Sequence, residues 1–212
     1  YYCTCSRSDL ASTTIDNHPC RENTTAPDRP HSIKIKVPDK TIAFKDRIQG
    51  QYSKNLYHDC GDFIIKRKDQ LYSYQLAVVV DDHEQCITDI VRGIDLIDST
   101  PWQMYLNSLM NFKQATYAHI PILINQEGQK LSKQTFAQEI TTHNKINTLL
   151  LAYSYLNQLP FECKPKSVHE FWNHAISNWN LNNISKIASK KDSCYFGGSA
   201  PAFAGQETQT FL

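Results

Sequence analysis

The longest unbroken apolar run in the chain constrains its fold more than any other feature. Residues 76–80 read Leu-Ala-Val-Val-Val and contain no polar side chain. A run of this length is typical of a strand that is covered on both faces, as in a parallel sheet. Asp81 and Asp82 follow it directly, at the position where the carboxyl ends of such strands place ligand sites. We therefore predict a buried strand that ends at residue 80, within an α/β fold.

Local patterns predict further strands and helices. Residues 33–37 alternate between apolar side chains and lysines, which is the period of a half-buried strand. Short apolar segments predict strands at residues 41–44, 62–67, 87–91 and 119–124. Ser99 and Thr100 before Pro101 are typical of a helix start. Apolar residues at helical spacing extend that helix to about residue 110 and predict two more, within residues 146–156 and 168–176.

The charge balance and hydropathy exclude some classes of protein. The chain has 212 residues, with 22 basic and 21 acidic side chains, so it is not a strongly basic protein that coats nucleic acid. A local basic patch could still bind RNA phosphates. The run Lys66, Arg67, Lys68 is one candidate, and the alternative is a solvated hairpin end. No segment approaches the roughly 18 apolar residues of a membrane span. We expect a cytoplasmic protein without a membrane partner.

The N-terminal segment carries a candidate metal site. Residues 1–31 are polar and lack periodicity, so they bury little apolar area and need another source of order, such as a metal ion. Cys3, Cys5 and Cys20 offer thiolates, which bind zinc tetrahedrally. The alternative is three buried or reactive cysteines without a metal. The eight histidines are scattered, and we interpret them as structural or solvated.

A lysine-containing loop follows the predicted strand at residues 119–124. Its sequence at residues 129–134 is QKLSKQ, so Lys130 and Lys133 lie three positions apart. Ammonium groups on such a loop suit a triphosphate, because they neutralise the charge that develops on the departing pyrophosphate. The pattern is short, and the alternative is a solvated loop without a ligand.

Four segments together resemble the glutamyl-Q tRNA(Asp) synthetase family, which is related to glutamyl-tRNA synthetase. They are the lysine loop and, before it, GDFIIKR at residues 61–67, YQLAVVVDD at residues 74–82 and ITDIVRGIDLIDSTP at residues 87–101. The resemblance covers about residues 1–185. It implies the C-terminal part of a class I synthetase catalytic domain of the Rossmann type, with a zinc-binding insertion and a short helical C-terminal segment.

The resemblance also implies roles for individual residues. Lys133 would contact ATP and Lys130 would assist it, while Tyr74 and Arg92 would bind glutamate. A guanidinium can hold a carboxylate through two parallel hydrogen bonds, and a tyrosine hydroxyl can fix the polar end of an amino acid. The alternative for Arg92 is an ion pair with a nearby aspartate, Asp95 or Asp98. The alternative for Tyr74 is an aromatic side chain in the core.

The metal pattern departs from that of the family. The family pattern resembles Cys-x-Cys followed by Tyr-x-x-x-Cys, with the tyrosine as the fourth ligand. Here Asp16 stands four positions before Cys20, and the spacing from Cys5 is one residue short. The fourth ligand could be Asp16 or His18, or the metal could be absent.

The predicted organisation has four parts. Residues 1–46 form the zinc-binding insertion, residues 47–134 the second half of the catalytic nucleotide-binding domain, residues 135–188 a helical segment and residues 189–212 a disordered tail. The chain starts at Tyr1 and contains no His-Ile-Gly-His-type ATP-binding motif. We therefore expect that an N-terminal part is missing and that this polypeptide alone is inactive.

The function implied by the resemblance is activation of glutamate with ATP and transfer of the glutamyl group to queuosine of tRNA(Asp). Mg²⁺ would accompany ATP, one Zn²⁺ would be structural, and the protein would be a monomer. One alternative is a glutamyl-tRNA synthetase that charges the tRNA 3′ end. Another is a non-catalytic module, derived from a synthetase, that binds tRNA or metal.

Overall fold

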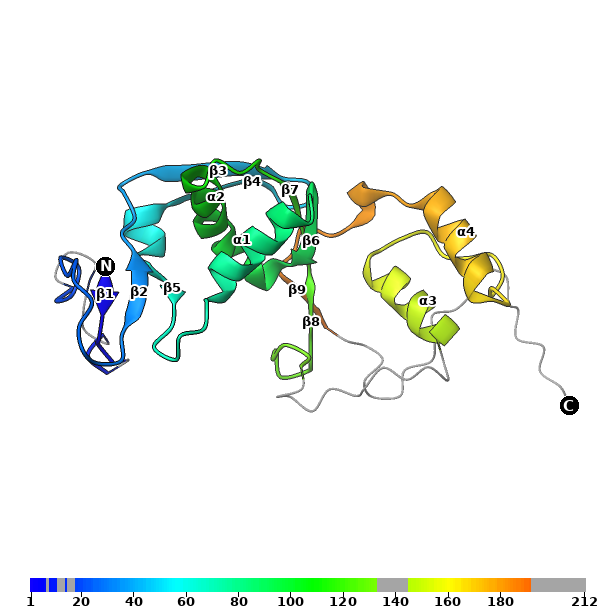
Figure 1. Cartoon of the computed structure of the whole chain (residues 1–212). Coiled ribbons are helices and arrows are strands. Elements are labelled where there is room, and N and C mark those ends of the chain that lie inside the picture. The colour runs from blue at the N-terminus through cyan, green and yellow to red at the C-terminus, as the bar shows by residue number, and fades with distance from the viewer. Residues whose placement is uncertain (7, 11–13, 15–17, 133–144, 192–212) are drawn as a thin grey trace, which may run out of the picture. The chain divides into compact units, whose positions relative to one another are not determined.

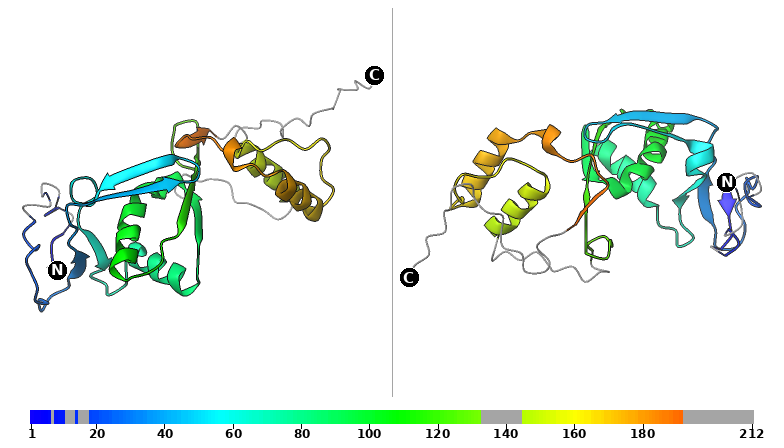
Figure 2. Two further views of the ribbon diagram at one scale, coloured as in Figure 1. Left: turned by 90° about the horizontal axis from the view of Figure 1, so that it is seen from above. Right: turned by 180° about the vertical axis from the view of Figure 1, so that it is seen from behind.

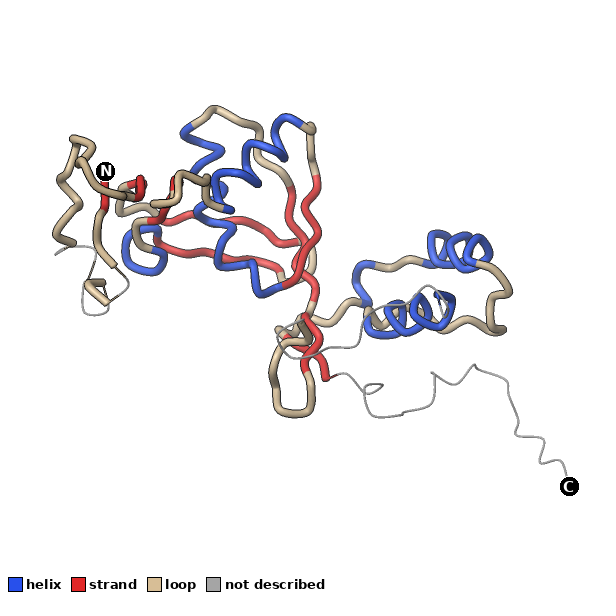
Figure 3. Tube along the Cα trace, turned by 60° about the horizontal axis from the view of Figure 1, so that its bottom comes forward, coloured by secondary structure: helices blue, strands red, loops and turns tan. Residues whose placement is uncertain are grey.

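The chain has a mixed α/β fold that divides into two compact units (Figures 1 and 3). The computed structural model describes residues 1–6, 8–10, 14, 18–132 and 145–191. The first unit contains Tyr1–Asp46, Gly50–Val91 and Leu96–Ala118. The second unit contains Arg47–Gln49, Arg92–Asp95 and the chain from His119 onward. Among the described residues, no helix has the length and apolar character needed to cross a bilayer.

A three-stranded antiparallel sheet joins the N-terminal segment to the rest of the first unit. Its order is β1-β2-β5, with β1 at Tyr2–Cys3, β2 at Ser32–Ile35 and β5 at Phe63–Lys66. Ile33 pairs with Tyr2 on one side and Lys66 on the other. The strands predicted around residues 33–37 and 62–67 are therefore confirmed.

A long hairpin follows β2. Strand β3 (Thr41–Asp46) pairs with β4 (Gly50–Asn55) along its whole length, and Figure 2 shows the two strands side by side. Gly50 has a φ of 87°, a left-handed conformation that glycine adopts without strain. The predicted division between residues 46 and 47 falls in the turn of this hairpin. A π-helical turn, η1 (Leu56–Cys60), comes next and buries Leu56 completely.

The prediction of a strand that ends at residue 80 is wrong. Residues 76–80 lie in helix α1 (Tyr74–Glu84), which packs beside helix α2 (Thr100–Leu109; Figure 1). Ser73 caps the helix, because its hydroxyl accepts a hydrogen bond from the Leu76 N–H at 3.5 Å. An unbroken apolar run fits a buried strand or a helix, since it carries no period. Within α1 only Val79 is fully buried.

The chain between α1 and the lysine loop follows the predicted order with shifted boundaries. Helix α2 begins at Thr100, as predicted. The expected strand at residues 119–124 is split at Pro121, which has no N–H to donate. The elements are β6 (Asp89–Gly93), the 3₁₀ helix η2 (Ile94–Ser99), α2 (Thr100–Leu109), β7 (Thr116–Ile120) and β8 (Ile122–Ile124). Strands β6 and β7 form a two-stranded sheet. The buried core of the first unit consists of Val37, Leu56, Phe63, Val79 and Leu106.

The second unit has a small core of its own. Helices α3 (Lys145–Tyr155) and α4 (Val168–Asn178) pack together, as the helical spacing predicts. Strand β9 (Ser189–Lys191) pairs in parallel with β8, so the first three residues of the predicted tail are ordered. The other tail residues lie outside the described part of the chain. The core residues are Leu150, Tyr153, Phe161, Phe171 and Ala175.

Candidate active site and metal centre

Arg92 is held by a buried histidine. Arg92 lies in β6, and its Nε donates a hydrogen bond to Nε2 of His119 in β7 at 3.1 Å. The His119 side chain is fully buried, and the side-chain amide of Gln49 donates to its backbone carbonyl at 2.8 Å. His119 was interpreted from the sequence as structural or solvated, because no local pattern connects it with Arg92. Only the fold brings these three residues together, within the second unit.

The beginning of the lysine loop is tied to the segment that follows Arg92. Nζ of Lys130 lies 2.6 Å from Oδ2 of Asp95, three residues after Arg92. Both side chains remain partly exposed, at 51% and 32%. Gly93 leaves room for this ion pair, since a Cβ at that position would lie 2.4 Å from Oδ1 of Asp95. Lys133 lies outside the described residues.

Tyr74 is the first residue of α1 and is 50% exposed. This exposure does not fit the alternative of an aromatic side chain packed in the core. Tyr74 belongs to the first unit, whereas Arg92 and Lys130 belong to the second. The roles of all three in substrate binding stay predictions.

Three residues of the N-terminal segment can hold a metal ion. One ligand atom each from Cys3, Cys5 and His18 lies within 4.8 Å of the other two. Cys20 is next to this group, with its Sγ 3.5 Å from that of Cys5. Two sulfurs bound to a tetrahedral zinc at about 2.3 Å are about 3.8 Å apart, so the spacing suits zinc. Asp16, the other candidate fourth ligand, lies outside the described residues.

The shifts in pKa at this group act in opposite directions on metal binding: the neutral ring of His18 favours it, whereas a thiol with a raised pKa gives up its proton less readily. Burial and the neighbouring ammonium of Lys34 lower the pKa of His18, which favours the neutral ring that binds metals. Burial and the neighbouring thiols of Cys20 and Cys3 raise the pKa of Cys5 to about 12. Nδ1 of His18 faces the Cys20 N–H at 3.2 Å, so metal binding at Nε2 requires this contact to be released.

The predicted basic run at residues 66–68 contacts the N-terminal segment that carries the candidate metal ligands. We call this segment, residues 1–31, the metal segment. Nζ of Lys68 donates to the backbone carbonyls of Thr4 and Cys5, at 2.7 and 2.9 Å. Arg67 forms an ion pair with Asp69 at 2.6 Å. The two backbone contacts give Lys68 a role in holding protein structure, which favours the hairpin-end interpretation for that residue.

The buried carboxylate of Asp62 also holds the metal segment, through Arg21 and Tyr1. Asp62, whose side chain is 4% exposed, accepts a hydrogen bond from Nε of Arg21 at 2.8 Å. It also accepts from the N–H of Val37 at 2.9 Å and from the hydroxyl of Tyr1 at 3.0 Å. Arg21 directly follows Cys20, so the ion pair connects the metal segment to the start of β5.

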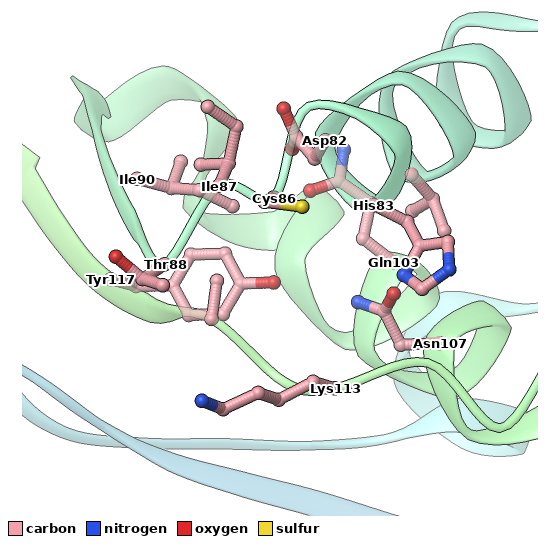
Figure 4. A pocket seen from close by; sticks show the side chains of 12 residues that line it. Asp82, His83, Cys86, Ile87, Thr88, Ile90, Gln103, Asn107, Lys113 and Tyr117 are labelled. Carbon is pink, nitrogen blue, oxygen red and sulfur yellow. The ribbon is translucent and has the colours of Figure 1, made fainter.

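A separate cavity of about 250 Å³ lies in the first unit. Side chains from α1, α2, β6, β7 and the loops between them line it, among them Asp82, Asn107, Lys113 and Tyr117 (Figure 4). Among its lining residues are none of those predicted to bind glutamate, ATP or metal. The cavity is therefore not part of the candidate active site.

Comparison with known proteins identifies the family. The sequence family described as tRNA synthetases class I (E and Q), catalytic domain, matches residues 6–185. The chain belongs to this family. It is similar to two proteins named Glutamyl-Q tRNA(Asp) synthetase. That of Acinetobacter baylyi is 39% identical over 184 residues, which are 87% of this chain and 62% of the relative. That of Neisseria meningitidis serogroup A is 39% identical over 198 residues, with coverages of 89% and 67%.

This class I synthetase chain thus spans about two thirds of the length of these curated relatives. Two solved structures have the same fold. A glutamate tRNA ligase from Elizabethkingia meningosepticum, crystallised with its amino acid, superposes with a TM-score of 0.59 and covers 76% of this chain and 36% of the ligase. The glutamate-tRNA synthetase of Elizabethkingia anophelis gives 0.60, with coverages of 78% and 37%. Both are 24% identical to this chain and bear on the fold alone.

Proposed function

We propose that the protein activates glutamate with ATP and transfers the glutamyl group to queuosine of tRNA(Asp). The observation that carries this proposal is the 39% identity to two glutamyl-Q tRNA(Asp) synthetases across almost nine tenths of this chain. In this reaction a glutamate carboxylate attacks the α-phosphate of ATP, and pyrophosphate leaves. A hydroxyl of the acceptor then attacks the glutamyl-adenylate and releases AMP.

Glutamate binding is assigned to Arg92 and Tyr74. The guanidinium of Arg92 would pair with a carboxylate of glutamate, and the hydroxyl of Tyr74 would form a hydrogen bond with the polar end of the same amino acid. This assignment is supported by the hydrogen bond that orients the Arg92 side chain. These residues act by positioning the reactants, without forming a covalent intermediate.

ATP binding is assigned to the lysine loop, with Mg²⁺ accompanying the nucleotide. Lys133 would contact the phosphates, and Lys130 would assist in neutralising the leaving pyrophosphate. The ion pair of Lys130 with Asp95 is no obstacle, because an exposed pair contributes at most about 1 kcal/mol. The ammonium can therefore exchange its carboxylate partner for a phosphate at little cost.

One structural Zn²⁺ is assigned to Cys3, Cys5 and Cys20, with His18 as the fourth ligand. This set replaces the tyrosine of the family pattern with a histidine that lies two positions before Cys20. Three thiolates and one imidazole are a common set for structural zinc. The ion would cross-link a segment that has little apolar core of its own.

Pyrophosphate exchange on the full-length protein tests the first step. We expect exchange that depends on glutamate and ATP. Lys133→Ala should slow it by about 100-fold, the usual effect of removing one charge-stabilising donor. Arg92→Gln should raise the KM for glutamate and leave that for ATP nearly unchanged. Exchange at the wild-type rate in Lys133→Ala would remove that lysine from the mechanism.

Transfer of labelled glutamate tests the acceptor. We expect label on tRNA(Asp) that carries queuosine and none on tRNA(Asp) with guanosine at that position. Label on tRNA(Glu) in place of tRNA(Asp) would identify a glutamyl-tRNA synthetase. A protein that binds tRNA but supports no exchange would be a non-catalytic module.

A further inference from the structure

The segment that joins β5 to α1 in Figure 1 exposes large apolar side chains. Leu71 is 60% exposed and Tyr72 is 65% exposed, and Tyr74, the first residue of α1, is 50% exposed. Single exposed apolar residues are common on protein surfaces, but three within four positions form a patch. All three belong to the first unit, and we call them the hairpin patch.

Backbone hydrogen bonds hold the hairpin patch in one conformation. The Arg67 N–H donates to the carbonyl of Leu71 at 2.8 Å, and the Gln70 N–H donates to the carbonyl of Arg67 at 3.0 Å. Tyr72 pairs with Lys66 across the hairpin as an antiparallel bridge. Because its backbone is already ordered, Tyr72 can bind a ligand with little further loss of conformational freedom.

A cation lies over the exposed ring of Tyr72. Nζ of Lys66 is 5.9 Å from the centroid of that ring. Lys68 and Arg67, the other cations of the hairpin, are bound by backbone carbonyls and by Asp69. In the part of the chain that the structure describes, Lys66 forms no ion pair with a carboxylate. Lys66 is therefore the cation of this hairpin that can meet the negative charge of a ligand.

An exposed aromatic ring beside a cation fits an unpaired nucleotide. The base stacks on the ring, and the ammonium group contacts a phosphate of the backbone. An apolar protein surface fits less well, because it would remove the ammonium of Lys66 from water without supplying a counter-charge. The charge of the hairpin therefore favours RNA over an apolar protein partner.

The position of Tyr72 in the chain indicates which nucleotide would stack on it. Two residues span at most about 7 Å, so Tyr72 lies close to Tyr74, which the proposed function places at the polar end of glutamate. The acceptor nucleotide must approach the activated carboxyl group of that glutamate. Enzymes that act on a nucleotide within RNA hold it outside the base stack, where aromatic side chains stack on the base.

We propose that Tyr72 stacks on the base of the acceptor nucleotide of the tRNA and that Lys66 contacts a phosphate beside it. This inference rests on the proposed function, in which an acceptor nucleotide attacks glutamyl-adenylate next to Tyr74. It adds to that function a contact with RNA that does not involve the binding of glutamate or ATP.

Transfer of labelled glutamate by the full-length protein tests the role of Tyr72. Tyr72→Ala removes the ring, and we expect the KM for tRNA(Asp) that carries queuosine to rise by about 5- to 150-fold, the range for losing one stacked base. Tyr72→Phe keeps the ring and should stay within about twofold of the wild-type KM. A wild-type KM in Tyr72→Ala would overturn the proposal. An equal fall in transfer and in pyrophosphate exchange without tRNA would also overturn it, because it would show a general defect of the catalytic site.

The salt dependence of tRNA binding tests the role of Lys66. Lys66→Met keeps an unbranched side chain and removes the charge. We expect the slope of log Kd against log salt concentration, measured by anisotropy of labelled tRNA, to fall by about 1, the value for one phosphate contact. Lys40→Met makes the same change at an exposed lysine of the first unit and should leave the slope unchanged. A wild-type slope in Lys66→Met would remove the phosphate contact from the proposal.

The wild-type protein separates failure of this inference from failure of the proposed function. If it places label on tRNA(Glu) and none on tRNA(Asp) with queuosine, the proposed function is wrong, and the acceptor contact falls with it. If it labels tRNA(Asp) and Tyr72→Ala does so with the same KM, only the inference fails. A crystal structure of the full-length protein in which another part of the chain covers the ring of Tyr72 would also overturn the inference.

Discussion

Asp62 connects the N-terminal segment to the start of β5. It is almost fully buried, and Arg21, Val37 and Tyr1 all donate hydrogen bonds to it. Replacing Asp62 with alanine removes the acceptor and leaves a partly buried guanidinium without its counter-charge. We expect Asp62→Ala to lower the free energy of unfolding by about 3 kcal/mol, measured with urea. A loss below about 1 kcal/mol would mean that the ion pair is no more important than an exposed one.

The same carboxyl group makes stability depend on pH. Burial raises the pKa of Asp62, but the hydrogen bonds from Arg21, Val37 and Tyr1 outweigh it and hold the pKa below its usual value. A lowered pKa stabilises the folded state above about pH 3.9, the value for an unfolded aspartate, and this contribution is lost as the pH falls through the folded pKa. The stability difference between wild type and Asp62→Asn should therefore shrink between pH 5 and the acid limit of folding. A difference independent of pH would contradict this assignment.

Gly93 is needed for space. An alanine Cβ at this position would lie 2.4 Å from Oδ1 of Asp95 and 3.2 Å from Cγ2 of Ile122. The carboxylate of Asp95 must then turn away from Lys130, so Gly93→Ala should break the ion pair and cost about 1–2 kcal/mol in urea unfolding. The loss should be smaller in an Asp95→Ala background, where the nearest atom is absent. An equal loss in both backgrounds would place the strain at Ile122.

At the scale of elements, strand β9 stabilises the end of helix α3. Nζ of Lys190 donates to the carbonyl of Tyr155, the last residue of α3, at 3.0 Å and also to the side chain of Asn157. A cation at this end of a helix satisfies a carbonyl and interacts favourably with the helix dipole. Lys190→Met should speed hydrogen exchange in the last turn of α3 and cost about 1 kcal/mol. Lys186→Met, at an exposed lysine nearby in sequence, should have no such effect.

Elements were predictable where a local signal was unambiguous. Helix α2 begins where Ser99, Thr100 and Pro101 place it, and α4 follows its helical spacing. For residues 76–80 the prediction of a strand is wrong because five consecutive apolar residues show neither helical nor strand periodicity. The cap at Ser73 and packing against α2 decide for a helix. Strand β9 was missed because its three residues, Ser189–Lys191, are polar and pair with a strand more than sixty positions earlier.

At the scale of the whole molecule, a metal ion should order one end of the chain without affecting the other. We expect elemental analysis of the full-length protein to find one zinc per chain and none in Cys3→Ser. Chelation should increase hydrogen exchange in residues 1–6 and 18–31, because those residues contribute little to the buried core of the first unit. The helices α3 and α4 have a separate core and should keep their protection. A folded wild-type protein without metal would contradict the zinc assignment.

The sequence alone determined the family resemblance, most of the strands and helices, and the cysteines and lysines that carry the proposed chemistry. These depend on residue type, on short spacing and on local caps, which a linear pattern contains. Only the tertiary structure brought His119 to Arg92 and Asp95 to Lys130, and it placed His18, one of the two candidate fourth ligands, beside Cys3. Each of these pairs joins side chains 15 to 35 positions apart. No local pattern records such a contact, because it forms only when separate elements pack against one another.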